Sequence, residues 1–262
     1  MKIAVIGAGA MGGATVEGLL ESDLFIPSDI TVADPVKDTR DKFADRGIYV
    51  TPDNNEAAAR ADIVMVVVKP WLVEQVLKGI KDTLDYSRQM LILTAAGIKS
   101  TQVTEWMSKD GGQMLPLFLV IPNIAIAFKA SMTFVVPIGA TPQQTHTVCE
   151  IFDDLGETHV TEERLLGAGT ALASSGIGYA MRYIRASSEG GVEMGFKAAD
   201  AVKIVLQTFK GAVRLLQTTG EHPEAAIDKV TTPGGITIRG LNEMENAGFT
   251  SAVIRGLKAG LV

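Results

Sequence analysis

The spacing of apolar residues changes once along the chain. Before Glu162, short apolar runs alternate with segments whose apolar residues recur at helical spacing. The runs at 2–6, 30–33, 62–68 and 90–94 contain few polar residues, which is typical of parallel strands that are covered on both faces. Strands that alternate with helices predict an α/β fold with a doubly wound parallel sheet.

The segments between these runs predict the helices of the sheet. A first helix is expected to end near Leu20, a second to cover 35–46 and stop at Gly47, and a third to open at Pro70. Proline is tolerated in the first turn of a helix. Beyond residue 114 the pattern predicts further strands at one edge of the sheet, a helix at 141–154 and a short strand near 157–160.

From Glu162 onward the strand pattern disappears. Helices are expected at 162–190, 197–219, 223–230, 235–247 and 250–260. The change of pattern predicts two domains, residues 1–160 and residues 161–262. The first of these helices is rich in Gly, Ala and Ser, which indicates close helix packing or a helix broken beside a ligand.

Composition and charge narrow the class of protein. The 262 residues are 47% hydrophobic and 21% charged, which excludes a disordered chain. The net charge is −6 and the basic residues are scattered, so no nucleic-acid partner is expected. The one cysteine, Cys149, excludes an internal disulfide and suits a reducing, cytoplasmic setting. The three histidines lack ligand spacing, so no metal site is expected.

The amino-terminal segment does not have the pattern of a signal peptide, because it lacks a basic region and a cleavage site. The longest apolar stretch, around 114–122, is too short to span a membrane. No membrane partner is therefore expected.

The strongest chemical pattern is Gly7-x-Gly9-x-x-Gly12, between an expected strand and an expected helix. In this context the first glycine forms a tight turn, the second lets the backbone approach a pyrophosphate, and the third lets the helix pack on the strand. The first N–H groups of the helix then face the phosphates. The alternative is a Gly-rich turn without a ligand, and the strand–turn–helix context favours dinucleotide binding.

Asp34 follows the second strand, and two roles are open for it. Its carboxylate could accept the ribose hydroxyls of NADH and repel the 2′-phosphate of NADPH. Lys37 and Arg40 follow and could hold that phosphate. Alternatively, Asp34-Pro35 only caps the next helix. The sequence leaves the choice between NADH and NADPH open.

A second candidate site is the run from Thr231 to Thr237, TTPGGIT. A helix that opens near Gly235 would expose N–H groups, and with the threonine hydroxyls these could hold a carboxylate. The alternative is a plain turn between two helices with threonine caps.

Taken together, these residues resemble the pyrroline-5-carboxylate reductase family, over nearly the whole chain. The most specific part is the run DKVTTPGGITIRGLNEME, residues 228–245. Supporting segments are the Gly7–Gly12 turn with Met11, Thr51-Pro52-Asp53-Asn54, Val68-Lys69-Pro70, Ala95-Ala96-Gly97, Pro122-Asn123, Glu189-Gly190-Gly191-Val192 and His222-Pro223.

The resemblance implies a Rossmann-like domain followed by an all-helical dimerisation domain, assembled as a homodimer or a ring of dimers. It implies reduction of 1-pyrroline-5-carboxylate to L-proline with NADPH or NADH. The residues it assigns to the cofactor are Gly7, Gly9, Ala10, Met11 and Gly12 at the pyrophosphate, Asp34 and Asn54 at the adenosine end, and Val68, Lys69, Pro70, Ala95, Ala96 and Asn123 towards the nicotinamide.

For the substrate, the resemblance implies binding by Ser175, Thr232, Gly234, Gly235, Ile236 and Thr237, with Thr237 as the catalytic residue at the ring nitrogen. The chain departs from the family pattern at Ile124, Ala125 and Ile177. These departures keep two alternatives open: a reductase of another cyclic imine carboxylate, and an inactive NAD(P)-binding regulatory protein.

Overall fold

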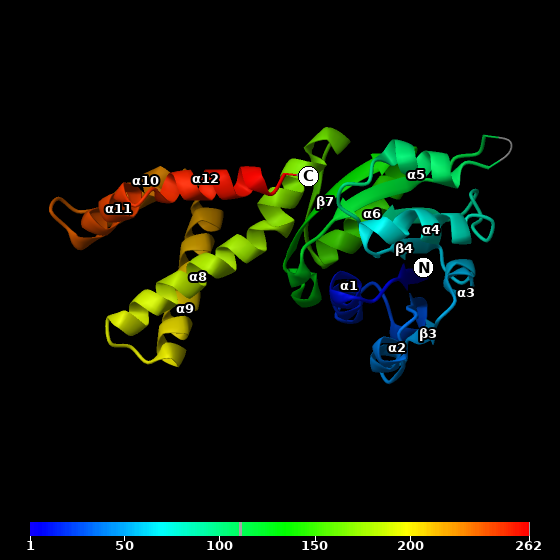
Figure 1. The fold of residues 1–262 in the computed structure, drawn as a ribbon, viewed down its shortest axis with the longest axis horizontal. Coiled ribbons are helices and arrows are strands. Elements are labelled where there is room, and N and C mark those ends of the chain that lie inside the picture. The colour runs from blue at the N-terminus through cyan, green and yellow to red at the C-terminus, as the bar shows by residue number, and fades with distance from the viewer. Residues whose placement is uncertain (110–111, 262) are drawn as a thin grey trace. The chain divides into compact units, whose positions relative to one another are not determined.

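The structure is a computed structural model that describes residues 1–109 and 112–261 (Figure 1). The strands of the described residues are β1 (Ile3–Ile6), β2 (Ile30–Ala33), β3 (Tyr49–Thr51), β4 (Ile63–Val66), β5 (Met90–Leu93), β6 (Leu117–Ile121), β7 (Ser131–Ile138) and β8 (Gly156–Val160). The α-helices up to β8 are α1 (Ala10–Leu20), α2 (Lys37–Ala44), α3 (Asn54–Ala59), α4 (Pro70–Ile80), α5 (Ser100–Met107) and α6 (Pro142–Asp154). Two 3₁₀ turns join them, η1 (Pro27–Asp29) and η2 (Ile124–Phe128).

All eight strands form one sheet in the order β3-β2-β1-β4-β5-β6-β7-β8. The strands from β3 to β6 are parallel, β7 runs antiparallel to β6, and β8 is parallel to β7. The chain moves outward from β1 to β3 and then returns to β4, so the strand order reverses between β1 and β4. This confirms the expected doubly wound sheet, including the further strands at one edge.

Each face of the sheet carries a hydrophobic core. Alternate residues of β1 belong to different cores, Ala4 and Ile6 to one and Ile3 and Val5 to the other. The first core is completed by residues of α3, α4 and α5, and the second by residues of α1, α2 and α6. Burial on both faces explains why the strands lack polar alternation.

The pattern missed β3, α3 and α5. β3 has only three residues and lies at the sheet edge, where Tyr49 is 38% exposed, so it carries little apolar signal. α3 begins where the Asp53 side chain accepts a hydrogen bond from the Asn55 N–H (2.8 Å). The helix expected at 35–46 is shorter, Lys37–Ala44, because Val36 is its extended N-cap residue.

The helix expected at 162–190 is interrupted. In its place lie η3 (Glu163–Leu165), α7 (Leu166–Gly169), a π-helical turn η4 (Thr170–Ser174) and α8 (Gly176–Glu193). The Ser175 N–H donates to the Thr170 carbonyl (2.8 Å), which is the wider bonding of a π turn. A Cβ at Gly169 would lie 2.9 Å from the Phe134 ring, so the glycine permits close packing on β7.

The chain forms two compact units, residues 1–175 with Leu261, and residues 176–260. The expected boundary near residue 160 would place η3, α7 and η4 with the helices, whereas these elements group with the sheet. The second unit consists of α8, α9 (Ala198–Thr219), α10 (Pro223–Val230), α11 (Ile236–Asn246) and α12 (Phe249–Ala259).

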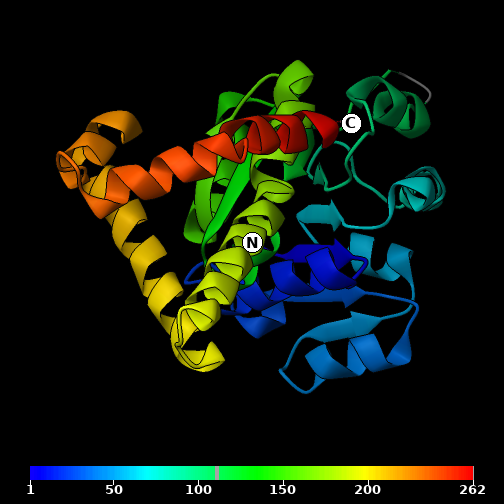
Figure 2. The same ribbon diagram turned by 60° about the vertical axis from the view of Figure 1, so that its left-hand side comes forward.

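Within the second unit, α8 and α9 pack against each other (Figure 2). The Tyr183 ring lies edge-on to the rings of Phe209 and Phe249, at centroid distances of 5.1 and 5.8 Å. Among its described residues, however, only Ser188, Gly191 and Ala201 are buried. Within 1–109 and 112–261, no helix is long and apolar enough to cross a bilayer.

Candidate functional site

The Gly7–Gly12 turn has the geometry that the sequence predicts. Gly7 has φ +93°, and a Cβ there would lie 2.5 Å from the Val67 carbonyl oxygen. A Cβ at Gly12 would lie 1.9 Å from the Gly7 carbonyl oxygen. Both positions therefore require glycine for the fold itself.

Gly9 is different. A Cβ at Gly9 would meet no described protein atom within 4 Å, and its φ of −64° suits any residue. Protein packing therefore does not explain this glycine. The open space leaves room for a bound group to approach the backbone, as a pyrophosphate does over a turn of this kind.

The amino-terminal end of α1 has the features of an anion-binding site. Gly9 is its N-cap residue, no side chain caps the helix, and the first turn contains no acidic residue. The first N–H groups and the positive end of the helix dipole are thus left for another acceptor. The turn and the helix start together fit the diphosphate of a dinucleotide.

Asp34 lies beside this turn and is 8% exposed. Its Oδ2 accepts a hydrogen bond from the Ala8 N–H (2.8 Å), and its Oδ1 accepts one from the Val36 N–H (2.9 Å). The carboxylate therefore joins the Gly-rich turn to the start of α2. A carboxylate offers about four acceptor positions, so this bonding leaves capacity for a ligand. Asp34 does not cap α2 itself, because Val36 is the N-cap residue of that helix and no side chain caps it; the ribose role stays a prediction.

The other residues assigned to the cofactor follow neighbouring parallel strands. Asn54 opens α3 after β3, Lys69 is the N-cap residue of α4 after β4, and Pro70 is the first residue of that helix. Val68 precedes them, Ala95 and Ala96 follow β5, and Asn123 follows β6. Since carboxyl ends of parallel strands meet at one edge, the structure brings these residues to the edge that carries the Gly-rich turn.

Hydrogen bonds hold the loop before Asn54 in place. The hydroxyl of Thr51 donates to the Glu56 carboxylate (2.5 Å), and the Tyr49 hydroxyl donates to the same carboxylate. The Thr51 and Tyr49 hydrogen bonds lower the pKa of the Glu56 carboxyl. The loop thus has its own support before any ligand binds.

Asn123 supports the backbone at the end of β6. It is buried, its N–H donates to the Ser131 hydroxyl (3.0 Å), and its Oδ1 accepts the Ala125 N–H (3.0 Å) as the cap of η2. Ile124, which departs from the family pattern, is 46% exposed directly after it.

A cavity of about 700 Å³ opens at the same edge. Within the first unit it is lined by residues that follow β5 and β6 and by the segment after β8, among them Ala96, Ile98, Thr101, Ile121, Glu163 and Thr170. It is large enough for a small cyclic substrate or a nicotinamide ring. Of these lining residues, the sequence reasoning named only Ala96.

Glu163 is a residue of this cavity that the sequence did not reveal. Its carboxylate accepts hydrogen bonds from the N–H (2.7 Å) and the hydroxyl (2.5 Å) of Ser100, the first residue of α5. The partners are 63 residues apart in the chain, so no local pattern indicates the pair.

The run from Thr231 to Thr237 forms a turn between α10 and α11. The Thr231 hydroxyl donates to the Ile227 (3.2 Å) and Asp228 (3.0 Å) carbonyls, and the Gly235 N–H donates to the Thr232 carbonyl (2.8 Å). Gly234 has φ +71°, and Gly235 is the N-cap residue of α11 without a side-chain cap.

The side chains of Thr232, Ile236 and Thr237 are exposed, Ile236 to 81%. The turn therefore carries both expected features, a threonine cap on α10 and an uncapped helix start at α11. Ser175, the remaining residue assigned to the substrate, lies in the first unit directly after the π turn and is half-buried. The structure places the Thr232–Thr237 turn in the second unit.

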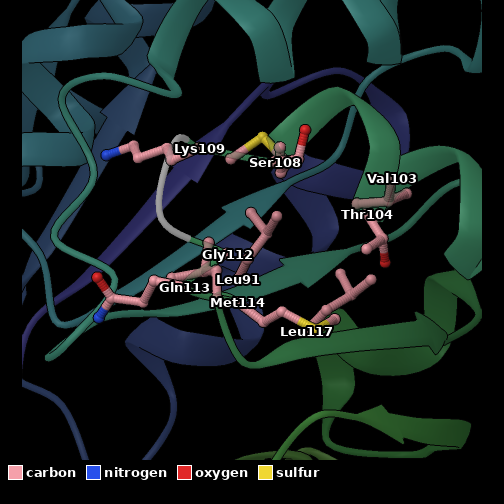
Figure 3. Close-up of a pocket in the computed structure, with 11 residues that line it drawn as sticks. Leu91, Val103, Thr104, Ser108, Lys109, Gly112, Gln113, Met114 and Leu117 are labelled. Atoms are coloured by element: carbon pink, nitrogen blue, oxygen red, sulfur yellow. The ribbon is translucent and has the colours of Figure 1, made fainter.

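A smaller cavity of about 70 Å³ lies at the opposite edge of the sheet (Figure 3). Leu91 and Leu117, near the amino ends of β5 and β6, line it together with Val103, Thr104 and Met107 of α5. It contains no residue of the predicted site. In the described part of the chain, no group of three or more His, Cys, Asp or Glu residues is arranged to hold a metal ion.

Comparison with known families matches the chain in two parts. Residues 2–97 match the family described as NADP oxidoreductase, coenzyme F420-dependent, and residues 163–261 match the family described as pyrroline-5-carboxylate reductase dimerisation. The chain thus combines a dinucleotide-binding domain with a helical dimerisation domain, and its cofactor is NAD(P)H.

Individual relatives match over the whole chain. Pyrroline-5-carboxylate reductase 1 of Dictyostelium discoideum is 36% identical over 97% of the chain, which spans only 48% of that longer relative. Pyrroline-5-carboxylate reductase 2 of the same organism is 32% identical over 98% of the chain and 89% of the relative.

A solved structure of Plasmodium falciparum pyrroline carboxylate reductase with NADP bound superposes with a TM-score of 0.90 at 24% identity, covering 99% of this chain and 95% of that one. At this identity the superposition shows the fold alone, whereas the sequence relatives show the family. This chain is a member of the pyrroline-5-carboxylate reductase family.

Proposed function

We propose that this chain reduces 1-pyrroline-5-carboxylate to L-proline by hydride transfer from NAD(P)H, the last step of proline biosynthesis. The observation that carries the proposal is the carboxyl edge of the parallel strands, where the Gly9 turn, the open start of α1 and a cavity of about 700 Å³ occur together. Family membership identifies the substrate class.

The reaction does not need a strong general acid or general base from the protein. The bound cofactor supplies a hydride that adds to C5 of the ring C=N bond, and the nitrogen gains a proton. A protonated or hydrogen-bonded imine carbon is already electrophilic, so the protein's work is alignment. The nicotinamide end would be oriented at the strand edge by Val68, Ala95, Ala96 and Asn123.

The turn between α10 and α11 would bind the substrate. With Gly235 as an uncapped N-cap residue, the first N–H groups of α11 can donate to a carboxylate. We assign carboxylate binding to Ser175, Thr232, Gly234, Gly235 and Ile236. The Thr237 hydroxyl would hydrogen-bond the ring nitrogen and relay a proton to it from solvent, regaining its own proton in the same transfer.

The helical unit would form a homodimer, or a ring of dimers. Its described helices bury few residues, and its sequence matches a dimerisation family. The single cysteine supports a reducing, cytoplasmic setting.

The first experiment is to mix purified protein with 1-pyrroline-5-carboxylate and follow the absorbance of NADH and, separately, of NADPH. The proposal expects oxidation of at least one of them and one proline formed for each cofactor consumed. Binding of cofactor without any turnover would favour the inactive regulatory alternative.

A variant tests the role of Thr237. Thr237→Val should lower kcat for pyrroline carboxylate by about a hundredfold or more, the range of a lost proton-transfer group, and leave the cofactor Kd unchanged. Thr208→Val, at an exposed threonine of α9, is the matched control. Unchanged kcat in Thr237→Val would remove Thr237 from the mechanism.

A second candidate substrate is another small cyclic imine carboxylate. It is favoured by Ile124, an exposed apolar residue at the end of β6 where the family pattern differs. Assays with imine carboxylates of different ring size would show a higher kcat/KM for one of them than for pyrroline-5-carboxylate.

A further inference from the structure

We propose that Asp34 makes this chain select NADH over NADPH. The inference rests on the proposed function only in requiring that a nicotinamide dinucleotide binds at the Gly-rich turn. It concerns the adenosine end of the cofactor, away from the imine chemistry.

The position of Asp34 is fixed by the sheet. β1 and β2 are paired in register with Ile6 opposite Ala33, and the Gly7 N–H donates to the Ala33 carbonyl (2.7 Å). Asp34 is the next residue, so its side chain begins where β2 meets the turn that would hold the diphosphate. An acid at the end of this strand meets the ribose of a bound dinucleotide.

The carboxylate cannot easily turn away from a ligand. Each of its oxygens already accepts a backbone N–H, from Ala8 at 2.8 Å and from Val36 at 2.9 Å, and the residue is only 8% exposed. The free acceptor positions can receive the two ribose hydroxyls, which are donors. A 2′-phosphate brings a charge of about −1.5 to −2 to the same place, where partial burial weakens solvent screening.

Two cations lie near Asp34, but carboxylates outnumber them. The Arg40 Nη1 donates to the Asp34 main-chain oxygen (2.6 Å), and the Lys37 Nζ pairs with Asp41 (2.5 Å). From residue 34 to residue 41 the chain has three carboxylates against two cations. The segment therefore offers a 2′-phosphate no net positive charge, although Lys37 and Arg40 alone would suggest one.

Binding without substrate tests the inference. Dissociation constants would be measured by titration calorimetry for NADH and NADPH, and for the adenosine-end probes 5′-ADP and adenosine 2′,5′-bisphosphate. The unphosphorylated member of each pair should bind at least about tenfold more tightly, the contribution of one hydrogen bond to a charged group. The difference should shrink as salt is added, because it is partly charge repulsion.

Two variants assign the effect to Asp34. Asp34→Asn removes the charge and keeps one acceptor, and Asp34→Ser shortens the side chain. Both should raise affinity for adenosine 2′,5′-bisphosphate and lower the NADH preference by about tenfold. Asp45→Asn, at an exposed carboxylate that ends α2 outside residues 34–41, should leave the preference unchanged.

The inference is overturned if the unmodified protein binds both members of each pair equally, or binds the 2′-phosphorylated member more tightly. It is also overturned if folded Asp34 variants keep the original preference. If the Asp34 variants do not fold, the preference is decided by the affinities of the unmodified protein for the two probe pairs. A preference that weakens as salt is added shows that charge repulsion contributes to it. Tight NADH binding without proline formation would reject the proposed function alone, and proline formation at equal affinities would reject this inference alone.

Discussion

At the scale of single residues, the three glycines of the Gly7–Gly12 turn have separable roles. We expect Gly9→Ala to fold with a free energy of unfolding within about 1 kcal/mol of the unmodified protein, since Gly and Ala differ modestly at an N-cap position. Its methyl group meets no described protein atom within 4 Å. Cofactor affinity should nevertheless fall by tenfold or more, because the methyl group takes the place of the diphosphate.

Gly12→Ala is the contrasting variant. Its Cβ would lie 1.9 Å from the Gly7 carbonyl oxygen, and relieving the clash should cost about 1–3 kcal/mol. Gly79→Ala, an exposed position of α4 with no neighbour within 4 Å of the added Cβ, should bind cofactor normally. Urea unfolding and calorimetry check all three variants. Normal cofactor affinity in Gly9→Ala would contradict diphosphate binding at this turn.

Tyr86 gives a prediction about pH. It is buried and donates to the Met107 carbonyl (2.5 Å), and burial raises the pKa of its hydroxyl to about 12. In the unfolded chain the pKa is about 10. The folded state therefore holds this proton more tightly, and the stability it contributes is complete below pH 10 and is lost as the pH rises towards 12.

Tyr86→Phe should remove this part of the alkaline loss and cost about 1 kcal/mol at neutral pH, because the Met107 carbonyl loses its donor. Urea unfolding between pH 8 and 11 measures both effects. Tyr179→Phe, at a residue that is 42% exposed, is the control. An alkaline slope that is the same in Tyr86→Phe and the unmodified protein would show that other groups cause it.

At the scale of elements, the sequence predicted those with a strong apolar signal. β1, β2, β4 and β5 were found because burial on both faces makes them continuously apolar, and Pro70 marked the start of α4. For the Gly-rich segment after Glu162 the sequence offered close packing or a broken helix, but it did not place the π turn at Thr170–Ser174. Gly169, which precedes this turn, packs against Phe134 of a strand distant in the sequence.

Two hydrogen bonds join Glu163 of η3 to Ser100 at the start of α5. Glu163→Gln weakens both hydrogen bonds from Ser100 and removes a negative charge from the start of α5. We expect a loss of about 1–3 kcal/mol in the free energy of unfolding, as for hydrogen bonds to a charged group. Glu162→Gln is the control, since Glu162 forms only an exposed pair with Arg164. Equal urea midpoints for the two variants would contradict the role of Glu163.

At the scale of the whole molecule, the site was less predictable than the fold. The Gly7–Gly12 turn and Asp34 could be named from one local motif between a strand and a helix, whereas the other cofactor residues were named from the family resemblance. The bonds from Asp34 to Ala8 and from Glu163 to Ser100 join distant segments, and no periodicity encodes them. The substrate assignments rest on the family motif, which names residues without giving their geometry.

The helices of the second unit expose a surface that one chain leaves uncovered. Ile204, Leu206 and Val213 of α9 are 47%, 49% and 52% exposed, and Val253 and Ile254 of α12 are 46% and 47% exposed. Large apolar side chains exposed in this number on two helices are typical of a subunit interface. We therefore expect light scattering to give at least twice the 27.8 kDa of one chain.

A charge on this surface should separate the subunits. Leu206→Glu places a carboxylate where an apolar side chain would be buried, which costs several kcal/mol without a partner, so the mass should fall towards that of one chain. The melting temperature should then stop rising with protein concentration, as mass action requires for a monomer. Gln207→Glu adds the same charge at a neighbouring polar position and should remain assembled. A monomeric unmodified protein, or an assembly unaffected by Leu206→Glu, would show that α9 does not contribute to the interface.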